Sequence, residues 1–144
     1  MNVGIIGFGL MGKQRAEDIS QLDFLNLKSV FDKNTDQLND FKKKYGFQIK
    51  KIPEDIINDS DIELIILSVP HNLIKDYAVK ILNQGKHLLC EKPLGRTINE
   101  SKKIINNLDQ SLLEPGFNYR YYDGIKKIKT LINDNEIGKV HSMR

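Results

Sequence analysis

Three glycines, Gly7, Gly9 and Gly12, follow the first apolar run of the chain in the stretch IIGFGLMG. In this spacing the first glycine permits a tight turn, the second lets backbone approach a pyrophosphate, and the third allows a helix to pack closely on a sheet. The start of that helix offers free N–H groups to phosphates. We expect a dinucleotide here, and a plain strand-to-helix turn is the alternative. The candidate residues are Gly7, Phe8, Gly9, Leu10, Met11 and Gly12.

An acidic residue stands at the end of the next apolar run. Asp32 lies 20 positions beyond Gly12 (32 − 12 = 20), where a carboxylate can accept hydrogen bonds from a ribose 2′-hydroxyl. A 2′-phosphate about 4 Å away would be repelled by roughly 4 kcal/mol per charge at an effective dielectric constant near 20. We therefore expect NAD as the cofactor. NADP stays open, because Lys33 either faces water or offsets part of this repulsion.

A polar stretch, residues 68–72, follows the apolar run LIIL. Open α/β sheets bind ligands at the carboxyl ends of their strands, so this stretch is a second candidate site. Its candidate cofactor-binding residues are Ser68, Val69, Pro70 and His71. Two alternatives stay open: His71 is a solvated loop residue, and Asn72 only caps the following helix.

These residues need a sheet that brings the ends of several strands together. Short apolar runs alternate with amphipathic stretches, which predicts parallel strands joined by right-handed helical crossovers. We expect strands over residues 3–6, 27–31, 47–49, 64–68, 88–90, 113–117 and 140–143. We expect helices over residues 11–20, 36–45, 54–58, 73–84, 98–108 and 122–133. The predicted fold class is α/β, a doubly wound parallel sheet of the Rossmann type.

Three helix ends have signals of their own. Thr97 and Glu100 have the spacing of a capping box, which predicts a helix start just after the Glu-Lys-Pro turn. Gly46 and Gly85 follow helical patterns, as glycines in the left-handed conformation do at helix ends.

Composition limits the kinds of protein to consider. The 144 residues are 40% hydrophobic and 28% charged, which suits one soluble domain. The net charge of +3 arises from 22 Lys and Arg interleaved with 19 Asp and Glu, so we expect neither nucleic acid nor a membrane as partner. Cys90 is the only cysteine, which favours the cytoplasm. We expect no metal site, and no stretch approaches the about 20 apolar residues of a membrane helix.

Several stretches together resemble the amino-terminal half of the glucose-fructose oxidoreductase, inositol dehydrogenase and MocA family. They are IIGFGLMG, SVPHNL, GKHLLCEKPLGRT, GFNYRYYDGIKKIKTLI and IGKVHSMR. Glu-Lys-Pro is the most specific element, because glycine turns of this kind occur in many dehydrogenases. The resemblance implies hydride transfer between a nicotinamide cofactor and a hydroxyl carbon of a sugar, a polyol such as inositol, or a sugar nucleotide.

The same resemblance implies roles for individual residues. Glu91 would hold the nicotinamide ribose, Lys92 would point at the reacting hydroxyl, and the Lys92–Pro93 bond would be cis. Asn118 and Arg120 match family positions near the cofactor and the substrate. Lys92 is thus the candidate catalytic residue, and Glu91, Lys92, Asn118 and Arg120 complete the candidate cofactor-binding set.

Lys92 has two possible modes of action in such a reaction. Oxidising an alcohol requires removal of a proton as hydride leaves, but a free lysine is protonated at neutral pH. Burial beside the positive nicotinamide ring would favour a neutral lysine that accepts the proton. A charged lysine would instead polarise the substrate oxygen. The alternative without chemistry is a salt bridge between Lys92 and a nearby carboxylate.

The resemblance also implies a domain division. We expect an NAD(P)-binding domain over residues 1–138 and, over residues 139–144, the start of a second, α+β substrate domain that is otherwise missing from this chain. The family's second domain completes the active site with an Asp and His motif, so we expect a fragment that is inactive alone. We also expect a homo-oligomer at full length. A non-catalytic dinucleotide-binding regulator or sensor is the competing hypothesis.

Overall fold

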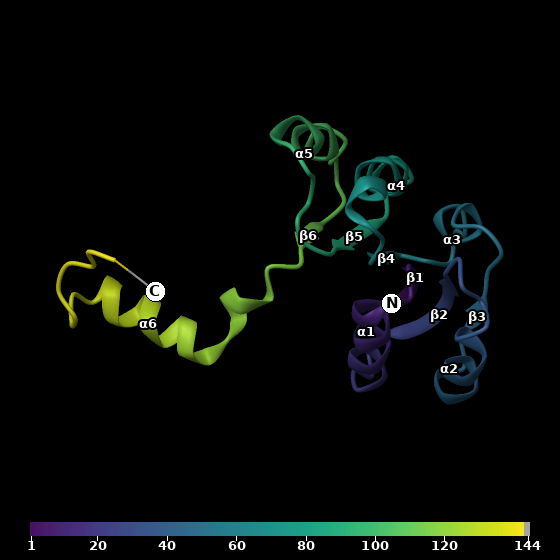
Figure 1. The fold of residues 1–144 in the computed structure, drawn as a ribbon, viewed down its shortest axis with the longest axis horizontal. Helices are drawn as coiled ribbons and strands as arrows, with labels where there is room; N and C mark the ends of the chain where they lie inside the picture. Colours follow the sequence, from purple (N-terminus) through teal and green to yellow (C-terminus); the bar gives the residue numbers. More distant parts are fainter. Residues whose placement is uncertain (143–144) are drawn as a thin grey trace.

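A parallel sheet forms the centre of the computed structural model, which describes residues 1–142 (Figure 1). Its strands are β1 (Asn2–Ile6), β2 (Asn26–Phe31), β3 (Gln48–Ile49), β4 (Leu64–Leu67), β5 (His87–Cys90) and β6 (Leu113–Pro115). Their order is β3-β2-β1-β4-β5-β6, and each neighbouring pair is parallel. The predicted doubly wound Rossmann-type sheet is confirmed.

Helices cover both faces of this sheet (Figure 1). They are α1 (Leu10–Ser20), α2 (Leu38–Tyr45), α3 (Glu54–Ile57), α4 (His71–Asn83) and α5 (Ile98–Ile105), followed by the 3₁₀ turn η1 (Asn118–Tyr121) and α6 (Asp123–Asn133). One buried apolar cluster contains residues of α1 and α2, and the other contains residues of α3, α4 and α5. The sheet therefore has one helical layer on each side.

Strand β4 shows why the sheet needs two layers. Ile66 belongs to the cluster under α1 and α2, whereas Ile65 and Leu67 belong to the cluster under α4 and α5. Successive side chains of a strand point to opposite faces, so a continuous apolar run such as LIIL must be covered on both sides.

The order of the strands reverses between β1 and β4. From β1 the chain builds outward through β2 and β3, then returns to β4 and continues outward through β5 and β6. The Ser68 amide donates to the Ile6 carbonyl oxygen at 2.9 Å, so the two central strands end side by side. Doubly wound sheets bind their ligands at this switch point.

The helix ends largely agree with their sequence signals. Gly46 and Gly85 have φ values of +76° and +69°, so their predicted left-handed conformation is confirmed. Thr97 Oγ1 accepts from the Glu100 amide at 3.2 Å. The Glu100 carboxylate does not return to the Thr97 amide but accepts from the Arg96 amide at 2.8 Å and pairs with the Arg96 side chain, so only half of a capping box forms.

The predicted strand over residues 140–143 is wrong in its described part. Residues 140–142 have no regular secondary structure, and Val140 is 42% exposed. A strand needs a neighbour for its backbone N–H and C=O groups, and no strand of the described residues pairs with this segment. Met143 lies outside the described residues.

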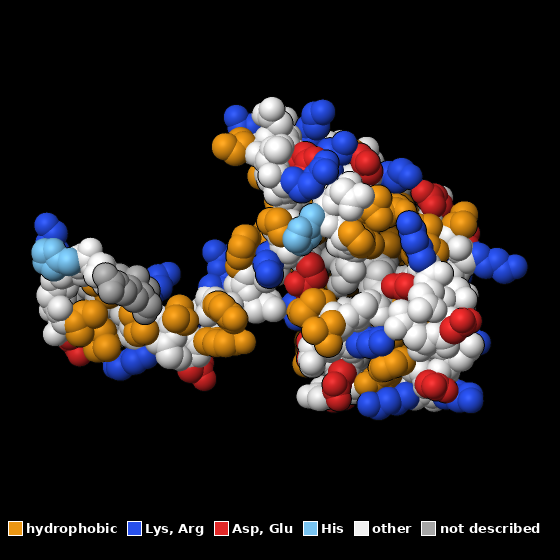
Figure 2. Space-filling model, in the orientation of Figure 1, with side chains coloured by type: hydrophobic (Ala, Val, Ile, Leu, Met, Phe, Trp, Pro, Cys, Tyr) orange, Lys and Arg blue, Asp and Glu red, His pale blue; other side chains and the backbone are white. Residues whose placement is uncertain are grey.

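The last helix is separate from the sheet domain. Figure 1 shows η1 and α6 extending away from it, and none of the 11 residues of α6 is buried. Figure 2 shows apolar side chains along η1 and α6. The exposed apolar residues of this segment include Tyr119, Tyr122, Ile125 and Ile128.

Candidate functional site

The glycine turn connects β1 to α1. Gly7 has a φ of +91°, and a side chain there would overlap the Ser68 carbonyl oxygen. A side chain at Gly12 would overlap the Gly7 carbonyl oxygen. A Cβ atom at Gly9 would meet nothing within 4 Å. Gly7 and Gly12 therefore fix the turn, while Gly9 leaves open space in front of the helix.

The start of α1 has groups available to bind an anion. Gly9 is the N-cap residue, and no side chain caps this helix end. The first N–H groups of a helix have no partner within the helix, and together with the helix dipole they favour phosphate. The Phe8 side chain is fully buried against Phe41 and Phe47, so Phe8 presents only backbone to this site.

Asp32 lies beside the same turn, directly after β2. Its Oδ2 atom accepts from the Phe8 amide at 2.5 Å, and its Oδ1 atom accepts from the Asn34 amide at 2.8 Å. The Gly7 amide donates to the Phe31 carbonyl oxygen at 2.8 Å. The carboxylate is thus held at the edge of the glycine turn, with the exposed Lys33 next to it.

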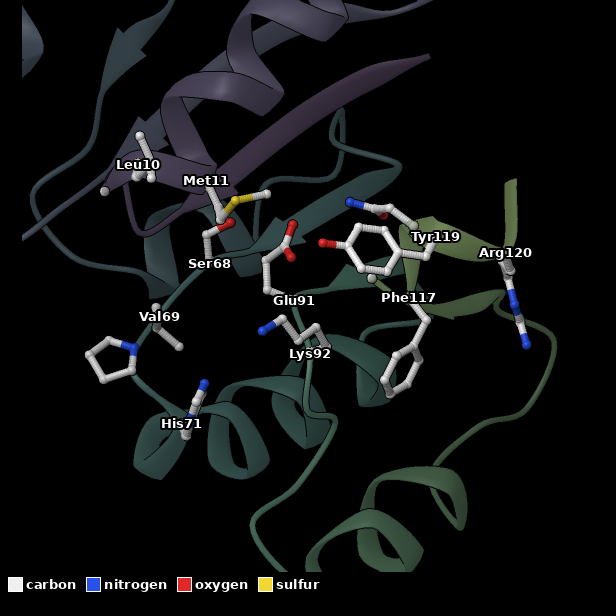
Figure 3. A pocket seen from close by; sticks show the side chains of 14 residues that line it. Leu10, Met11, Ser68, Val69, His71, Glu91, Lys92, Phe117, Tyr119 and Arg120 are labelled. Atoms are coloured by element: carbon white, nitrogen blue, oxygen red, sulfur yellow. The ribbon is translucent and has the colours of Figure 1, made fainter. Parts of the chain in front are cut away.

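A cavity of about 900 Å³ opens at the carboxyl ends of β1, β4 and β5. Figure 3 shows the side chains that line it. The lining residues are Gly9, Leu10, Met11, Ser68, Val69, Pro70, His71, Glu91, Lys92, Gly116, Phe117, Asn118, Tyr119 and Arg120. Of the predicted site residues, Gly7, Phe8, Gly12, Asp32 and Lys33 do not line it. The others, from four separate segments of the sequence, meet at this cavity.

Glu91 is buried just past β5 and is paired. Arg15 of α1 donates to Glu91 Oε1 from Nε at 3.0 Å and from Nη2 at 2.8 Å. The glutamate is 9% exposed, so this ion pair offsets much of the cost of burying its charge. The preceding Cys90 is fully buried, and burial, with a smaller contribution from the Glu91 charge, raises the pKa of the Cys90 thiol to about 12.

Lys92 is exposed and directs its amine into the cavity (Figure 3). The Lys92–Pro93 peptide bond is cis, as the resemblance implies. Among residues 1–142, no carboxylate forms a salt bridge with Lys92. Within the described part of the chain, Lys92 therefore does not form the salt bridge that was its alternative role.

The segment after β4 forms the opposite wall. Helix α4 begins at His71, two positions before the predicted start, and its N-cap residue is Pro70. His71 is therefore a helical residue, and Asn72 is not the cap. Ser68 Oγ is completely covered and has no hydrogen-bond partner among the described residues. Such a group is costly to leave unsatisfied, so Ser68 marks this wall as a place for a polar ligand atom.

The segment after β6 supplies the remaining wall. Asn118 Oδ1 accepts from Arg15 Nη2 at 3.3 Å. The Arg120 side chain is 61% exposed, lies 3.9 Å from the Glu114 carboxylate, and points away from Glu91 in Figure 3. Asn118 thus belongs to the inner part of the site and Arg120 to its rim.

Sequence reasoning missed four residues of this site. Phe117 and Tyr119 line the cavity on either side of the predicted Asn118, and Gly116 gives Glu91 room, since a Cβ atom there would lie 2.9 Å from Glu91 Oε2. Proximity to the Asn-Tyr-Arg stretch could have indicated these three. Arg15 is the fourth, and no local pattern links it to Glu91, 76 positions away.

The described residues contain neither a metal cluster nor a membrane helix. Within residues 1–142, no group of three or more His, Cys, Asp or Glu side chains is arranged to hold a metal ion. No helix in the same range is long and apolar enough to cross a membrane.

Comparison with known proteins identifies the fold and the family. The model of the oxidoreductase family with an NAD-binding Rossmann fold, named GFO_IDH_MocA, matches residues 1–112. The chain belongs to this family. The predicted family and its dinucleotide-binding fold are therefore confirmed.

Similar curated proteins extend the match over the whole chain. A myo-inositol 2-dehydrogenase of Thermotoga maritima is 29% identical over all of this chain and 44% of its own length. A glucose-6-phosphate 3-dehydrogenase of Bacillus subtilis is 30% identical over 99% of this chain and 41% of its own length. The chain thus spans about two fifths of these relatives, and their remaining length has no counterpart in these 144 residues.

A solved structure superposes on nearly the whole of this chain and again on about two fifths of its own length. A levoglucosan dehydrogenase in complex with NADH and levoglucosan superposes with a TM-score of 0.85 and is 28% identical, over 96% of this chain and 40% of that one. The fold of that enzyme and its complex with NADH agree with the dinucleotide predicted from the glycine turn.

Proposed function

We propose that this chain is the nucleotide-binding part of an NAD(P)-dependent oxidoreductase. The reaction transfers hydride between a nicotinamide and a hydroxyl carbon of a sugar, a polyol such as inositol, or a sugar nucleotide. One observation carries the proposal: the uncapped start of α1 at Gly9 and the Glu91-Lys92 turn border the same cavity. A dinucleotide anchored by its phosphates at the helix extends its nicotinamide toward the lysine.

The residues present fit NAD along its length. In this proposal the adenosine ribose binds Asp32, the pyrophosphate binds residues 7–12, and Glu91 holds the nicotinamide ribose. The covered Ser68 Oγ, which has no partner among the described residues, gains one from the cofactor. The Asp32 carboxylate favours NAD over NADP, as the sequence predicts. Bound NAD supplies the hydride acceptor.

Lys92 is the residue that we propose acts on the substrate. Its exposed amine faces the cavity without a carboxylate partner in the described part of the chain, so it is available to a hydroxyl group. His71, Asn118 and Arg120 border the same space and supply further polar contacts. These roles follow from position and chemistry, since each side chain offers hydrogen-bond donors or acceptors to a polyol.

The remaining parts of the proposal concern the whole protein. We propose that residues 1–138 form the NAD(P)-binding domain, that residues 139–144 begin a substrate-binding domain, and that the full-length protein is a cytoplasmic homo-oligomer. The relatives' greater length supports the second domain. A substrate must be held about 3 to 3.5 Å from the reacting nicotinamide, and in this proposal the second domain closes the open side of the cavity for that purpose.

Calorimetric titration of the 144-residue chain with NAD tests the cofactor assignment. We expect saturable binding of one NAD per chain, and no formation of reduced nicotinamide, followed by absorbance, with a panel of polyols, sugars and sugar nucleotides. Absence of binding by both NAD and NADP would contradict the proposal. Turnover by the chain alone would show that the active site needs no second domain. A longer protein that binds NAD but oxidises no member of the panel would favour the sensor hypothesis.

A further inference from the structure

Arg15 joins three elements around the cavity. Its guanidinium, on α1, donates two hydrogen bonds to Glu91 Oε1 at the end of β5 and one, at 3.3 Å, to Asn118 Oδ1 in η1. A weaker contact of 3.4 Å joins Arg15 Nη1 to Asp18 on its own helix. Arg15 itself does not line the cavity, whereas Glu91 and Asn118 do. Any influence of Arg15 on a ligand therefore passes through these two side chains.

Burial makes the contact between Arg15 and Glu91 strong and directional. The two side chains are 14% and 11% exposed, so water screens their attraction less than that of a surface pair. Both hydrogen bonds meet at Oε1, which fixes the rotation of the carboxylate. The second oxygen, Oε2, lies on the side of Gly116, where the absence of a Cβ atom leaves room for it.

The position of Arg15 on α1 connects the two ends of the proposed cofactor site. It lies three positions after Gly12 (15 − 12 = 3), so the helix whose start binds phosphate also holds the side chain that orients Glu91. We propose that Arg15 is a positioning residue that fixes the Glu91 carboxylate and the Asn118 amide for the nicotinamide half of NAD. This inference rests on the proposed function, because it assigns Arg15 a task within that site.

The two halves of the cofactor provide the test. ADP-ribose contains the adenosine, the pyrophosphate and the second ribose but lacks the nicotinamide ring, and AMP lacks the second ribose as well. For Arg15→Met, calorimetry should show NAD binding weakened roughly tenfold, as expected for loss of an oriented hydrogen bond to a charged group. AMP binding should stay within about twofold of the unmodified chain. ADP-ribose, which keeps the ribose that Glu91 holds, should follow NAD.

Matched variants separate orientation from charge and from folding. Lys13→Met removes a positive charge from the same helix, but its amine lies over the Phe41 ring, 5.2 Å from the centroid, and does not contact Glu91. Asp18→Asn removes the other carboxylate near Arg15. Both should leave NAD affinity within about twofold of the unmodified chain. Arg15→Lys keeps the charge but has only one donor nitrogen, so NAD should bind it more tightly than Arg15→Met. It also serves as the test if Arg15→Met does not fold.

A double-mutant cycle with Glu91→Gln tests whether Arg15 acts through Glu91. Since Arg15 acts mainly through Glu91 and also through Asn118, Arg15→Met should weaken NAD binding less in the Glu91→Gln background than in the unmodified chain. Equal weakening of AMP and NAD by Arg15→Met would overturn the inference in favour of a general structural role, and unchanged NAD affinity would overturn it directly. Failure of the unmodified chain to bind NAD, NADP and AMP is a different result, which overturns the proposed function itself.

Discussion

The Phe8 amide donates a hydrogen bond of 2.5 Å to the Asp32 carboxylate, across 24 positions of the sequence. This contact ties the end of β2 to the glycine turn, at the place where the proposed adenosine ribose binds. Asp32 therefore has two tasks, one in the fold of the turn and one in cofactor selection. Asn and Ser substitutions separate them in part. Asn keeps one acceptor, which can serve the Phe8 amide but not also the Asn34 amide, whereas Ser has no acceptor at this distance from the backbone.

Asp32→Asn should weaken NAD binding roughly tenfold through loss of a charged hydrogen-bond acceptor. NADP should gain relative to NAD, since the variant no longer repels a 2′-phosphate. Asp32→Ser should show the same change in preference and a lower melting temperature than Asp32→Asn, because the Phe8 amide then loses its partner as well. Titrations with both cofactors and thermal melts measure these effects. If the unmodified chain already binds NADP more tightly than NAD, the role of Asp32 is wrong.

Gly7→Ala should mainly lower stability, whereas Gly9→Ala should mainly weaken NAD binding. Gly7 has a φ of +91° and would overlap the Ser68 carbonyl oxygen if it carried a side chain. A positive φ costs an ordinary residue about 1 to 2 kcal/mol, so Gly7→Ala should lower the free energy of unfolding by at least this amount. Gly9→Ala should leave stability within about 0.5 kcal/mol and weaken NAD binding, since its methyl group occupies the space next to the phosphates.

Urea unfolding and NAD titration of both glycine variants measure this difference. Gly46→Ala is a useful comparison for Gly7→Ala, because Gly46 also has a positive φ of +76° but would meet nothing within 4 Å. It should be destabilised less than Gly7→Ala and retain NAD binding. A stable Gly7→Ala variant that binds NAD normally would show that the turn is not as tightly fixed as its geometry indicates.

The parts of the site that the sequence predicts are those encoded locally. The glycine turn needs Gly7, Gly9 and Gly12 within one short stretch, and central strand β4 is a continuous apolar run, so the sequence alone indicates both. The Arg15–Glu91 pair joins residues 76 positions apart, and only the assembled sheet brings them together. The strand predicted over residues 140–143 is wrong for a related reason. A strand forms only beside a neighbouring strand, and no pattern within these residues shows whether one is present.

Cys90 should make stability fall as the solution becomes alkaline. Burial raises its pKa from 9.0 to about 12, so above pH 9 the unfolded chain loses the thiol proton while the folded chain retains it. The folded state then binds more protons than the unfolded state, and stability decreases with rising pH through this window. Between pH 8 and pH 10, the unmodified chain should lose roughly 1 kcal/mol more than Cys90→Ala.

Urea unfolding of both chains at the two pH values measures this difference. Thiol labelling provides an independent check, because a fully buried thiol should react with iodoacetamide at pH 8 only through opening of the fold. Labelling of the native chain at the rate seen in urea would contradict the buried position of Cys90.

Lys92→Ala should separate catalysis from cofactor binding. In a protein that continues this chain with its substrate-binding domain, the variant should lower turnover by roughly 100-fold, as expected for loss of a positioned proton-transfer or polarising group. NAD affinity should change little, because the Glu91 carboxylate and the glycine turn remain in place. Lys102→Ala, which removes an exposed lysine of α5, is the matched control and should retain full turnover.

Lys92→Arg then distinguishes the two modes of action of the lysine. A guanidinium keeps the positive charge but does not give up its proton at any pH used for an enzyme assay. If Lys92 stays charged and polarises the substrate oxygen, Lys92→Arg should keep more turnover than Lys92→Ala. If Lys92 accepts the proton as hydride leaves, both variants should be equally impaired, and only the unmodified enzyme should show turnover that rises with pH as the amine loses its proton. Steady-state rates across a pH series measure both. Full turnover in Lys92→Ala would exclude a catalytic role for this lysine and leave Glu91 and the glycine turn as a binding site alone.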